Sequence, residues 1–188
     1  MISKALQFTS DTINQFVKNR YGIDENLVVL NSLLESNGAV PQLNQNKLVL
    51  SLINIEKETN KPYYVHSQKN TVDGFSNVSP QERVNLEILV SSNFDNYTEA
   101  LKLIDTAMLF FQLHLKMDSK THATFPGDLQ KIEFELVKIS YHQMHSLWTA
   151  MGAKYQPSVV YLLRLINIQG NEPHIFIPAI KGTTNNLS

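Results

Sequence analysis

Two stretches of alternating apolar residues restrict this chain to folds built around a β-sheet. In residues 47–56 (KLVLSLINIE), Leu48, Leu50 and Leu52 share one face, and the opposite face is also largely apolar. A strand that is apolar on both faces is typical of the interior of a sheet that is covered on both sides. Residues 83–92 (RVNLEILVSS) place an apolar residue at every second position, which predicts a second strand with a buried face.

Three further segments have strand character, at residues 27–33, 131–140 and 159–168. The last of them, VVYLLRLINI, is rich in β-branched and aromatic residues, which suit a pleated and buried position. Pro157 can precede it because a missing N–H is harmless at the start of a strand. The sequence SNGAVP at residues 36–41 predicts a turn.

Two long helices are predicted, at residues 2–20 and from residue 96 onward. Apolar residues recur at helical spacing in the first, and Gly22 is placed to end it. The sequence NYTE at residues 96–99 has the form of a capping box. From Ala107 the second helix is apolar on nearly every side, which indicates burial by its own domain or by a neighbour. We expect its buried stripe to comprise Tyr97, Leu101, Ile104, Met108, Phe111 and Leu115.

A third, shorter helix is predicted at residues 141–152, with Ser140 as its N-cap and Gly152 at its end. Strands joined by short turns dominate one half of the chain. The sequence therefore predicts an α+β fold, with two main helices and one short helix packed on a mixed, largely antiparallel β-sheet.

The length of 188 residues suits one domain with extensions. We expect residues 1–168 to form a single domain that carries a long loop or insertion at residues 57–82, and residues 169–188 to form a C-terminal extension. A loop of this length is usually functional or disordered, although PYYV within it has the composition of a short strand. The extension holds an apolar patch, HIFIPAI, which we expect to contact either its own domain or a neighbouring protein.

Charge and composition exclude several classes of function. The 16 basic and 17 acidic residues form no basic run, so no nucleic-acid surface is predicted. The absence of cysteine excludes disulfides and thiol chemistry. The sequence shows neither the apolar core of a signal peptide nor a run of about 18 apolar residues, so membrane insertion is not predicted. We expect a soluble protein made in the cytoplasm.

The sequence offers no motif for catalysis, a cofactor or a metal. Its seven glycines form no phosphate-binding loop, and HExxH does not occur. His142 and His145 are three residues apart on the short helix, but a zinc site needs further ligands, and surface histidines are the simpler interpretation. Ser140 lacks the flanking glycines of a nucleophile elbow. Glu133 and Glu135 alternate with apolar residues, as solvated strand residues do. We therefore predict no enzyme, but a protein that binds or assembles.

The segment that begins at Leu147-Trp148 and continues after Thr149 as AMGAKYQPSVVYLLRL resembles the signature of the tail-terminator, or cap, proteins of contractile injection systems. These systems are phage-tail-like particles built by bacteria. Three further blocks agree in the same order, namely VVLNSL at 28–33, NKLVLSLINIEKE at 46–58 and LEILVSSNFDNYTEALKLI at 86–104. The matching signature positions are Ala150, Gly152, Ala153, Lys154, Tyr155, Pro157, Ser158, Val159 and Tyr161.

The resemblance implies a structural protein that forms a hexameric ring at the particle end distal to the baseplate. The ring seals the inner tube and contacts the last ring of sheath. The implied partners are further copies of the chain, the tube protein and the sheath protein, without a cofactor. Assembly would take place in the bacterial cytoplasm, and the protein would stay in the particle. The alternatives are a terminator or completion protein of a contractile phage tail, an adaptor that forms no ring, and a small enzyme with a site built from the long loop and scattered histidines.

A closed ring uses head-to-tail contacts, which commonly rest on aromatic and aliphatic side chains. Trp148 on an apolar helix face is either a core residue or an interface anchor. Arg164 stands among apolar neighbours, so we expect it to be paired, to lie at a sheet surface or to face a partner. The candidate partner interface comprises Phe110, Phe111, Trp148, Tyr155, Arg164, Ile175, Phe176 and Ile177.

Overall fold

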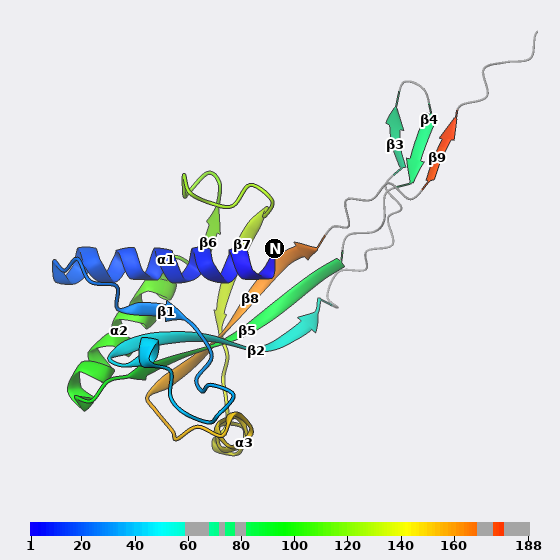
Figure 1. Ribbon diagram of the computed structural model, residues 1–188. Helices are drawn as coiled ribbons and strands as arrows, with labels where there is room; N and C mark the ends of the chain where they lie inside the picture. Colours follow the sequence, from blue (N-terminus) through cyan, green and yellow to red (C-terminus); the bar gives the residue numbers. More distant parts are fainter. Residues whose placement is uncertain (59–67, 72–73, 78–81, 169–174, 179–188) are drawn as a thin grey trace, which may run out of the picture. The chain divides into compact units, whose positions relative to one another are not determined.

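The computed structural model describes residues 1–58, 68–71, 74–77, 82–168 and 175–178 (Figure 1). The chain divides into two compact units, which are described separately below. The elements are α1 (Ile2–Tyr21), β1 (Val28–Leu30), the 3-10 helix η1 (Gln42–Asn44), β2 (Lys47–Lys57), β3 (Gln68–Thr71), β4 (Gly74–Asn77), β5 (Glu82–Asn93), α2 (Tyr97–Leu113), β6 (Lys116–Asp118), β7 (Lys131–Leu136), α3 (Tyr141–Met151), β8 (Ser158–Ile168) and β9 (Ile175–Pro178).

The larger unit, residues 1–58 and 83–167, is built on a six-stranded sheet with the strand order β1-β2-β5-β8-β7-β6. β1 runs parallel to β2, whereas the β2–β5, β7–β8 and β6–β7 pairs are antiparallel. The two long alternating stretches form β2 and β5, which pair along their length with one irregularity between Leu52 and Asn54. The α+β fold with a mixed sheet, two main helices and one short helix is confirmed.

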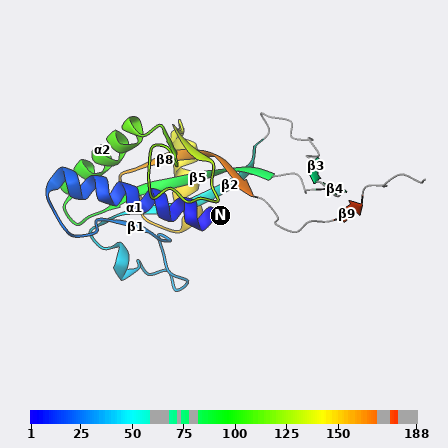
Figure 2. The same ribbon diagram turned by 90° about the horizontal axis from the view of Figure 1, so that it is seen from above.

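One face of this sheet is covered by α1 and α2 (Figure 1, Figure 2). β5 shows how the sequence pattern produces the packing, because Val84, Leu86, Ile88 and Val90 alternate along it and are all buried. They join apolar residues of both helices in one core cluster. Burial of apolar surface on this scale is the main source of stability of such a domain.

The opposite face of the sheet is covered by α3. Leu89 of β5 and Val160 of β8 point away from the main core and form a second cluster with Trp148 of α3. Partly buried apolar side chains of the neighbouring segments, including Ile139 and Met144, complete this cluster. α3 thus covers a part of the sheet face with far fewer buried side chains than α1 and α2 bring to the other face.

Helix α2 is oriented differently from its predicted stripe. Ile104 and Phe111 are buried as expected, but Tyr97 and Leu101 are 66% and 42% exposed, and Leu115 lies beyond the end of the helix. The helix is apolar around most of its circumference, so the spacing of apolar residues did not determine which side faces the sheet. The side that packs into the protein comprises Ala100, Leu103, Ile104, Thr106, Ala107, Phe110 and Phe111.

Several strand boundaries also differ from the predicted ones. β1 ends at Leu30, and the side chain of the next residue, Asn31, donates to Asn44 Oδ1 of η1 at 2.9 Å. β7 ends at Leu136, four residues before the N-cap of α3. The segment between α2 and β7 contains β6 and contributes the fully buried Met117 to the core.

The smaller unit contains a three-stranded antiparallel sheet with the order β3-β4-β9. β3 and β4 lie in the stretch 57–82, and β9 lies in the C-terminal extension. The backbone of Ile175–Pro178 pairs with Gly74–Asn77, so part of the apolar HIFIPAI patch pairs with the long insertion of its own chain. The PYYV segment lies outside the described residues.

Candidate interaction surface

The residues considered for catalysis take part in structural contacts. Ser140 is the N-cap of α3, where its Oγ accepts a hydrogen bond from the backbone N–H of Gln143 at 3.3 Å. Glu133 and Glu135 each form an ion pair at 2.6 Å with a basic side chain. In the residues that the structure describes, no three His, Cys, Asp or Glu side chains are grouped to hold a metal ion. The described helices include none with the length and apolar character of a membrane span.

The segment from Ile139 to Pro157, which we call the α3 corner, is shaped by strong local signals. A capping box starts α3, because Ser140 and Gln143 satisfy each other's backbone N–H groups. Gly152 ends the helix in the left-handed conformation at φ 67°, which favours glycine. Pro157 then leads into β8, and its carbonyl accepts from the backbone N–H of Ser92 at 2.9 Å. The signature segment of the sequence therefore fixes the chain between α3 and β8.

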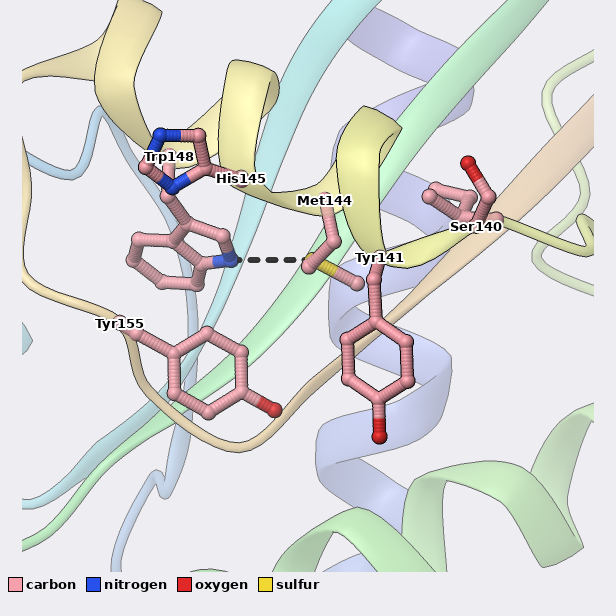
Figure 3. A pocket seen from close by; sticks show the side chains of 7 residues that line it. Ser140, Tyr141, Met144, His145, Trp148 and Tyr155 are labelled. Carbon is pink, nitrogen blue, oxygen red and sulfur yellow. Dashed lines mark hydrogen bonds between the residues drawn. The ribbon is translucent and has the colours of Figure 1, made fainter.

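An open cavity of about 510 Å³, which we call the aromatic pocket, lies on the α3 corner (Figure 3). Trp148 is 5% exposed and forms one wall, and its indole N–H donates to Met144 Sδ at 3.2 Å. The Tyr155 ring stands edge-on to the indole, with 5.6 Å between ring centroids. Tyr141 is 97% exposed and Tyr155 is 66% exposed. The lining residues are Ile139, Ser140, Tyr141, Met144, His145, Trp148 and Tyr155.

A second cavity of about 330 Å³ shares Trp148 with the aromatic pocket. Leu33 and Leu34, from the connection between β1 and β2, line one part of it, and Gly152 and Lys154 line another. Because one indole contributes to both cavities, a movement of Trp148 would alter both at once.

The α3 corner and the residues just before it contain basic but no acidic side chains. Residues 136–157 contain Lys138 and Lys154 but no Asp or Glu. Both lysines are exposed, and neither has a carboxylate partner within the described parts of the chain. His142 and His145 are also exposed on α3. The segment that carries the aromatic pocket thus has a positive formal charge, although the two lysines do not line the pocket itself.

A second apolar surface runs along the outer side of α2. It comprises Tyr97, Leu101 and Met108, which are 66%, 42% and 36% exposed, and we call it the α2 stripe. Spacings of four and seven residues place these side chains on one side of the helix. Leu115, which is 64% exposed, follows the end of the helix. Exposed apolar side chains that line up in this way are typical of an interaction surface.

Arg164 is paired within its own subunit, as the sequence allowed. Its Nε and Nη2 donate to Glu135 Oε2 at 2.8 and 2.6 Å, and its Nη1 lies 3.9 Å from Glu58 Oε2. The Glu58 side chain is only 5% exposed and also accepts from Asn85 Nδ2 at 3.1 Å. The charge of Arg164 thus compensates carboxylates on the β2–β5–β8–β7 part of the sheet.

The structure separates the eight candidate interface residues into groups. Phe110 and Phe111 are 0% and 1% exposed in the main core, so they offer no surface to a partner. Trp148 and Tyr155 come together in the aromatic pocket. Ile175, Phe176 and Ile177 lie in β9, whose backbone pairs with β4.

Sequence reasoning missed Tyr141, which is the most exposed large apolar residue of the described chain. A signal for it was present, because an aromatic residue directly after an N-cap stands in the first turn of the helix. A side chain in that position has no preceding helical turn to pack on.

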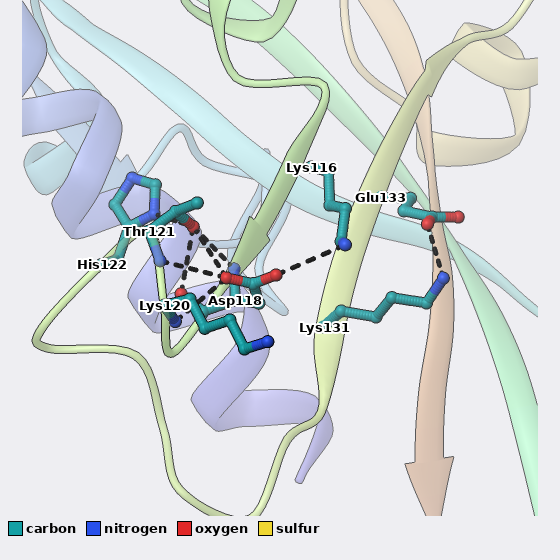
Figure 4. A network of polar contacts seen from close by, with 7 residues as sticks. All are labelled: Lys116, Asp118, Lys120, Thr121, His122, Lys131 and Glu133. Atoms are coloured by element: carbon teal, nitrogen blue, oxygen red, sulfur yellow. Dashed lines mark hydrogen bonds and ion pairs between the residues drawn. The ribbon is translucent and has the colours of Figure 1, made fainter.

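A network of polar contacts holds the loop that follows β6 (Figure 4). Asp118 accepts from the backbone N–H groups of Lys120 and Thr121, both at 3.0 Å. Burial acts to raise the pKa of Asp118, but the hydrogen bonds outweigh it and the pKa lies below its usual value. Burial, together with repulsion by the neighbouring His114, lowers the pKa of His122. Asp118 and His122 are therefore two groups of this loop whose protonation is coupled to folding.

The sequence matches the family model described as the Pvc16 N-terminal domain over residues 9–181. No curated protein sequence matches the chain significantly. Two solved structures share its fold. One is the PVC sheath/tube terminator of an extracellular contractile injection system in the extended state, with 10% identity and a TM-score of 0.57. The other is the anti-feeding prophage cap, described as a tube terminating cap, with 11% identity and a TM-score of 0.61.

Both matches cover 94% of this chain, but only 62% of the sheath/tube terminator and 59% of the cap. The chain therefore spans about three fifths of the length of these two proteins. At such low identity, the likeness shows a common fold.

Proposed function

Because the chain belongs to the family of the Pvc16 N-terminal domain, we propose that it caps the distal end of the tube in a contractile injection particle. The resemblance to tail-terminator proteins is confirmed by the family match and by the two structures. One observation carries the proposal. Nearly the whole chain has the fold of proteins described as a sheath/tube terminator and as a tube terminating cap.

The proposed cap is a ring of six identical subunits that sits on the last ring of tube and contacts the last ring of sheath. A closed ring needs two different surfaces of each subunit to meet head to tail. The α2 stripe supplies one such surface, because its apolar side chains are exposed while the other side of the helix is fixed in the core. We assign a subunit–subunit contact of the ring to this stripe.

The role is structural and does not include catalysis. Ser140, Glu133 and Glu135, the residues with the most suitable chemistry, are engaged in capping and ion pairing. The two structural relatives are described as a terminator and a cap. We expect the subunit to be made in the bacterial cytoplasm, where the particle assembles, and to remain part of the particle.

The position of the protein on the particle tests this function. The protein is tagged in its native host, particles are purified, and a gold label on the tag is located by negative-stain electron microscopy. We expect label at one end only of sheathed rods, whereas the same tag on the sheath protein, as a control, labels the whole length. Label along the rods, or unlabelled rods in a culture that makes the tagged protein, contradicts the capping role. Capsid genes next to the gene would instead indicate a phage tail.

A further inference from the structure

We propose that the aromatic pocket binds an extended, proline-containing segment of a partner protein whose flanks are acidic. This inference goes beyond the capping role, because neither ring assembly nor contact with a tube is needed for a single subunit to bind such a segment. It rests on two exposed tyrosines beside the buried Trp148, on the hydrogen bonding of these three side chains and on the charge of the adjoining segment.

The aromatic pocket exposes apolar ring surface to solvent. Tyr141 and Tyr155 project on the same side of α3 as the Trp148 ring, and all three line one cavity (Figure 3). The phenol rings are 97% and 66% exposed, which is unusual for side chains that gain from burial. The cavity of about 510 Å³ has room for more than one side chain of a guest. Aromatic walls of this kind receive proline rings and short aliphatic side chains by flat contact.

The aromatic side chains of the pocket carry hydrogen-bond donors that a guest could use. The Trp148 N–H donates to Met144 Sδ, and a thioether is a weak acceptor. The hydroxyl groups of Tyr141 and Tyr155 have no hydrogen-bond partner in the described parts of the chain. A polyproline II segment has no internal hydrogen bonds, so its carbonyl oxygens are available to such donors. The pocket thus presents donors where an extended peptide presents acceptors.

The charge of the segment around the pocket limits which guest can bind. Aromatic pockets also hold cations, but here Lys138 and Lys154 flank the pocket in sequence and no carboxylate is present in residues 136–157. Two lysines next to the lining residues Ile139 and Tyr155 disfavour a cationic guest. Carboxylates on either side of a proline segment would instead be attracted by the two lysines, which favours acidic flanks.

The test uses the full chain and the emission of Trp148, which is its only tryptophan. The probe is a blocked decapeptide of prolines and leucines with two glutamates at each end. We expect a saturable change of the emission, with half of the change below roughly 1 mM peptide. A peptide with lysines in place of the glutamates should bind at least about fivefold more weakly, and one with glycines in place of the prolines weaker still.

Matched variants distinguish binding at this site from non-specific binding of the peptide. Tyr141→Ala should weaken binding of the glutamate peptide at least about fivefold, since it removes a wall of the pocket. Tyr97→Ala, on the α2 stripe, removes a tyrosine as exposed as Tyr155 and should leave binding unchanged. Replacing Lys138 and Lys154 together by glutamate should reverse the preference between the glutamate and lysine peptides.

Three results would overturn the proposal: no saturable change with any peptide, equal binding of the glutamate and lysine peptides, or an equal loss in Tyr97→Ala and Tyr141→Ala. The result of gold labelling on particles is independent of this titration. A cap that fails to bind peptides and a peptide-binding protein that is not a cap are therefore distinguishable.

Discussion

The two faces of the six-stranded sheet differ in how completely they are closed. On the face covered by α1 and α2, 24 buried apolar residues form one continuous cluster. On the face covered by α3, the buried cluster comprises Leu89, Trp148 and Val160, and two cavities adjoin it. The same strand serves both faces, since Ile88 points into the large cluster and Leu89 into the small one.

This difference suggests a division of roles within one domain. The closed face supplies the apolar burial that folds the chain, whereas the open face carries exposed aromatic side chains and the Arg164 ion pairs. A surface that is not needed for folding is free to be used for binding. Substitutions on the two faces should therefore have different consequences, and the following predictions are ordered by the size of the expected effect.

The largest effect is expected in the main core. Phe110→Ala removes a fully buried ring that packs against Phe16 and Phe111, and should lower the free energy of unfolding by about 3–5 kcal/mol. Tyr141→Ala, on the open face, should change it by less than about 0.5 kcal/mol. Urea unfolding followed by circular dichroism measures both. Similar losses in the two variants would remove the distinction between the faces.

The next effect tests whether the open face also contributes to stability through its ion pairs. Arg164→Met removes a cation that lies 3.9 Å from the buried Glu58 carboxylate and 2.6 Å from Glu135, and should destabilise the fold by about 2 kcal/mol. This is less than for a fully buried pair, because the Arg164 side chain is 29% exposed. Glu135→Gln is the control: its carboxylate is 59% exposed and should contribute less than about 1 kcal/mol. An effect of Glu135→Gln as large as that of Arg164→Met would show that Glu58 is not the decisive partner.

A smaller effect is expected at the turn that ends α3. Gly152→Ala should lower the free energy of unfolding by about 1 kcal/mol, because φ 67° is unfavourable for alanine. The added methyl group itself has room, since the nearest atom, Leu34 Cδ1, lies 3.8 Å from its position. Gly127→Ala is the matched control, with no positive φ and nothing within 4 Å of the added carbon. Thermal unfolding of both variants checks this, and equal melting temperatures would contradict the account of the turn.

The smallest effect concerns pH. The pKa of His122 is lowered by burial and by His114, so the folded state resists a protonation that the unfolded state accepts below about pH 6.5. Stability should therefore fall as the pH decreases from 7.5 to 5.5, with no loss from this group above pH 7. His122→Gln should flatten that decrease. An unchanged slope of melting temperature against pH in the variant would mean that other groups dominate.

Much of the fold could be predicted from the sequence, because its local signals agree with its packing. Alternation defined β2 and β5, Gly22 and Gly152 ended their helices in the left-handed conformation, and Ser140 capped α3. The orientation of α2 could not be predicted, since a helix that is apolar on nearly every side carries no dominant period. β3, β4 and β9 were also missed, because polar and short segments become strands through pairing partners that are distant in sequence.

The candidate surface was predicted only in part. Trp148 and Tyr155 were both predicted as interface candidates, with a core position as the alternative for Trp148, and both line the aromatic pocket. Phe110 and Phe111 have the same apolar character in sequence, but both are buried in the main core. Composition does not separate a core aromatic from an exposed one, because this depends on the rotation of the helix about its axis. The exposure of the α2 stripe therefore became evident only in three dimensions, whereas Tyr141 could have been identified from its place directly after the N-cap of α3.

The most direct test of the capping role is the length of the particles made with and without this protein. Sheathed rods from producing cells are measured by electron microscopy in the native strain, in a strain lacking the gene and in a strain complemented with it. A cap predicts rods of uniform length in the native and complemented strains, and tubes of irregular or excessive length, or none with a closed end, when the gene is absent. Rods of unchanged length and closed ends in the absence of the gene would contradict the account.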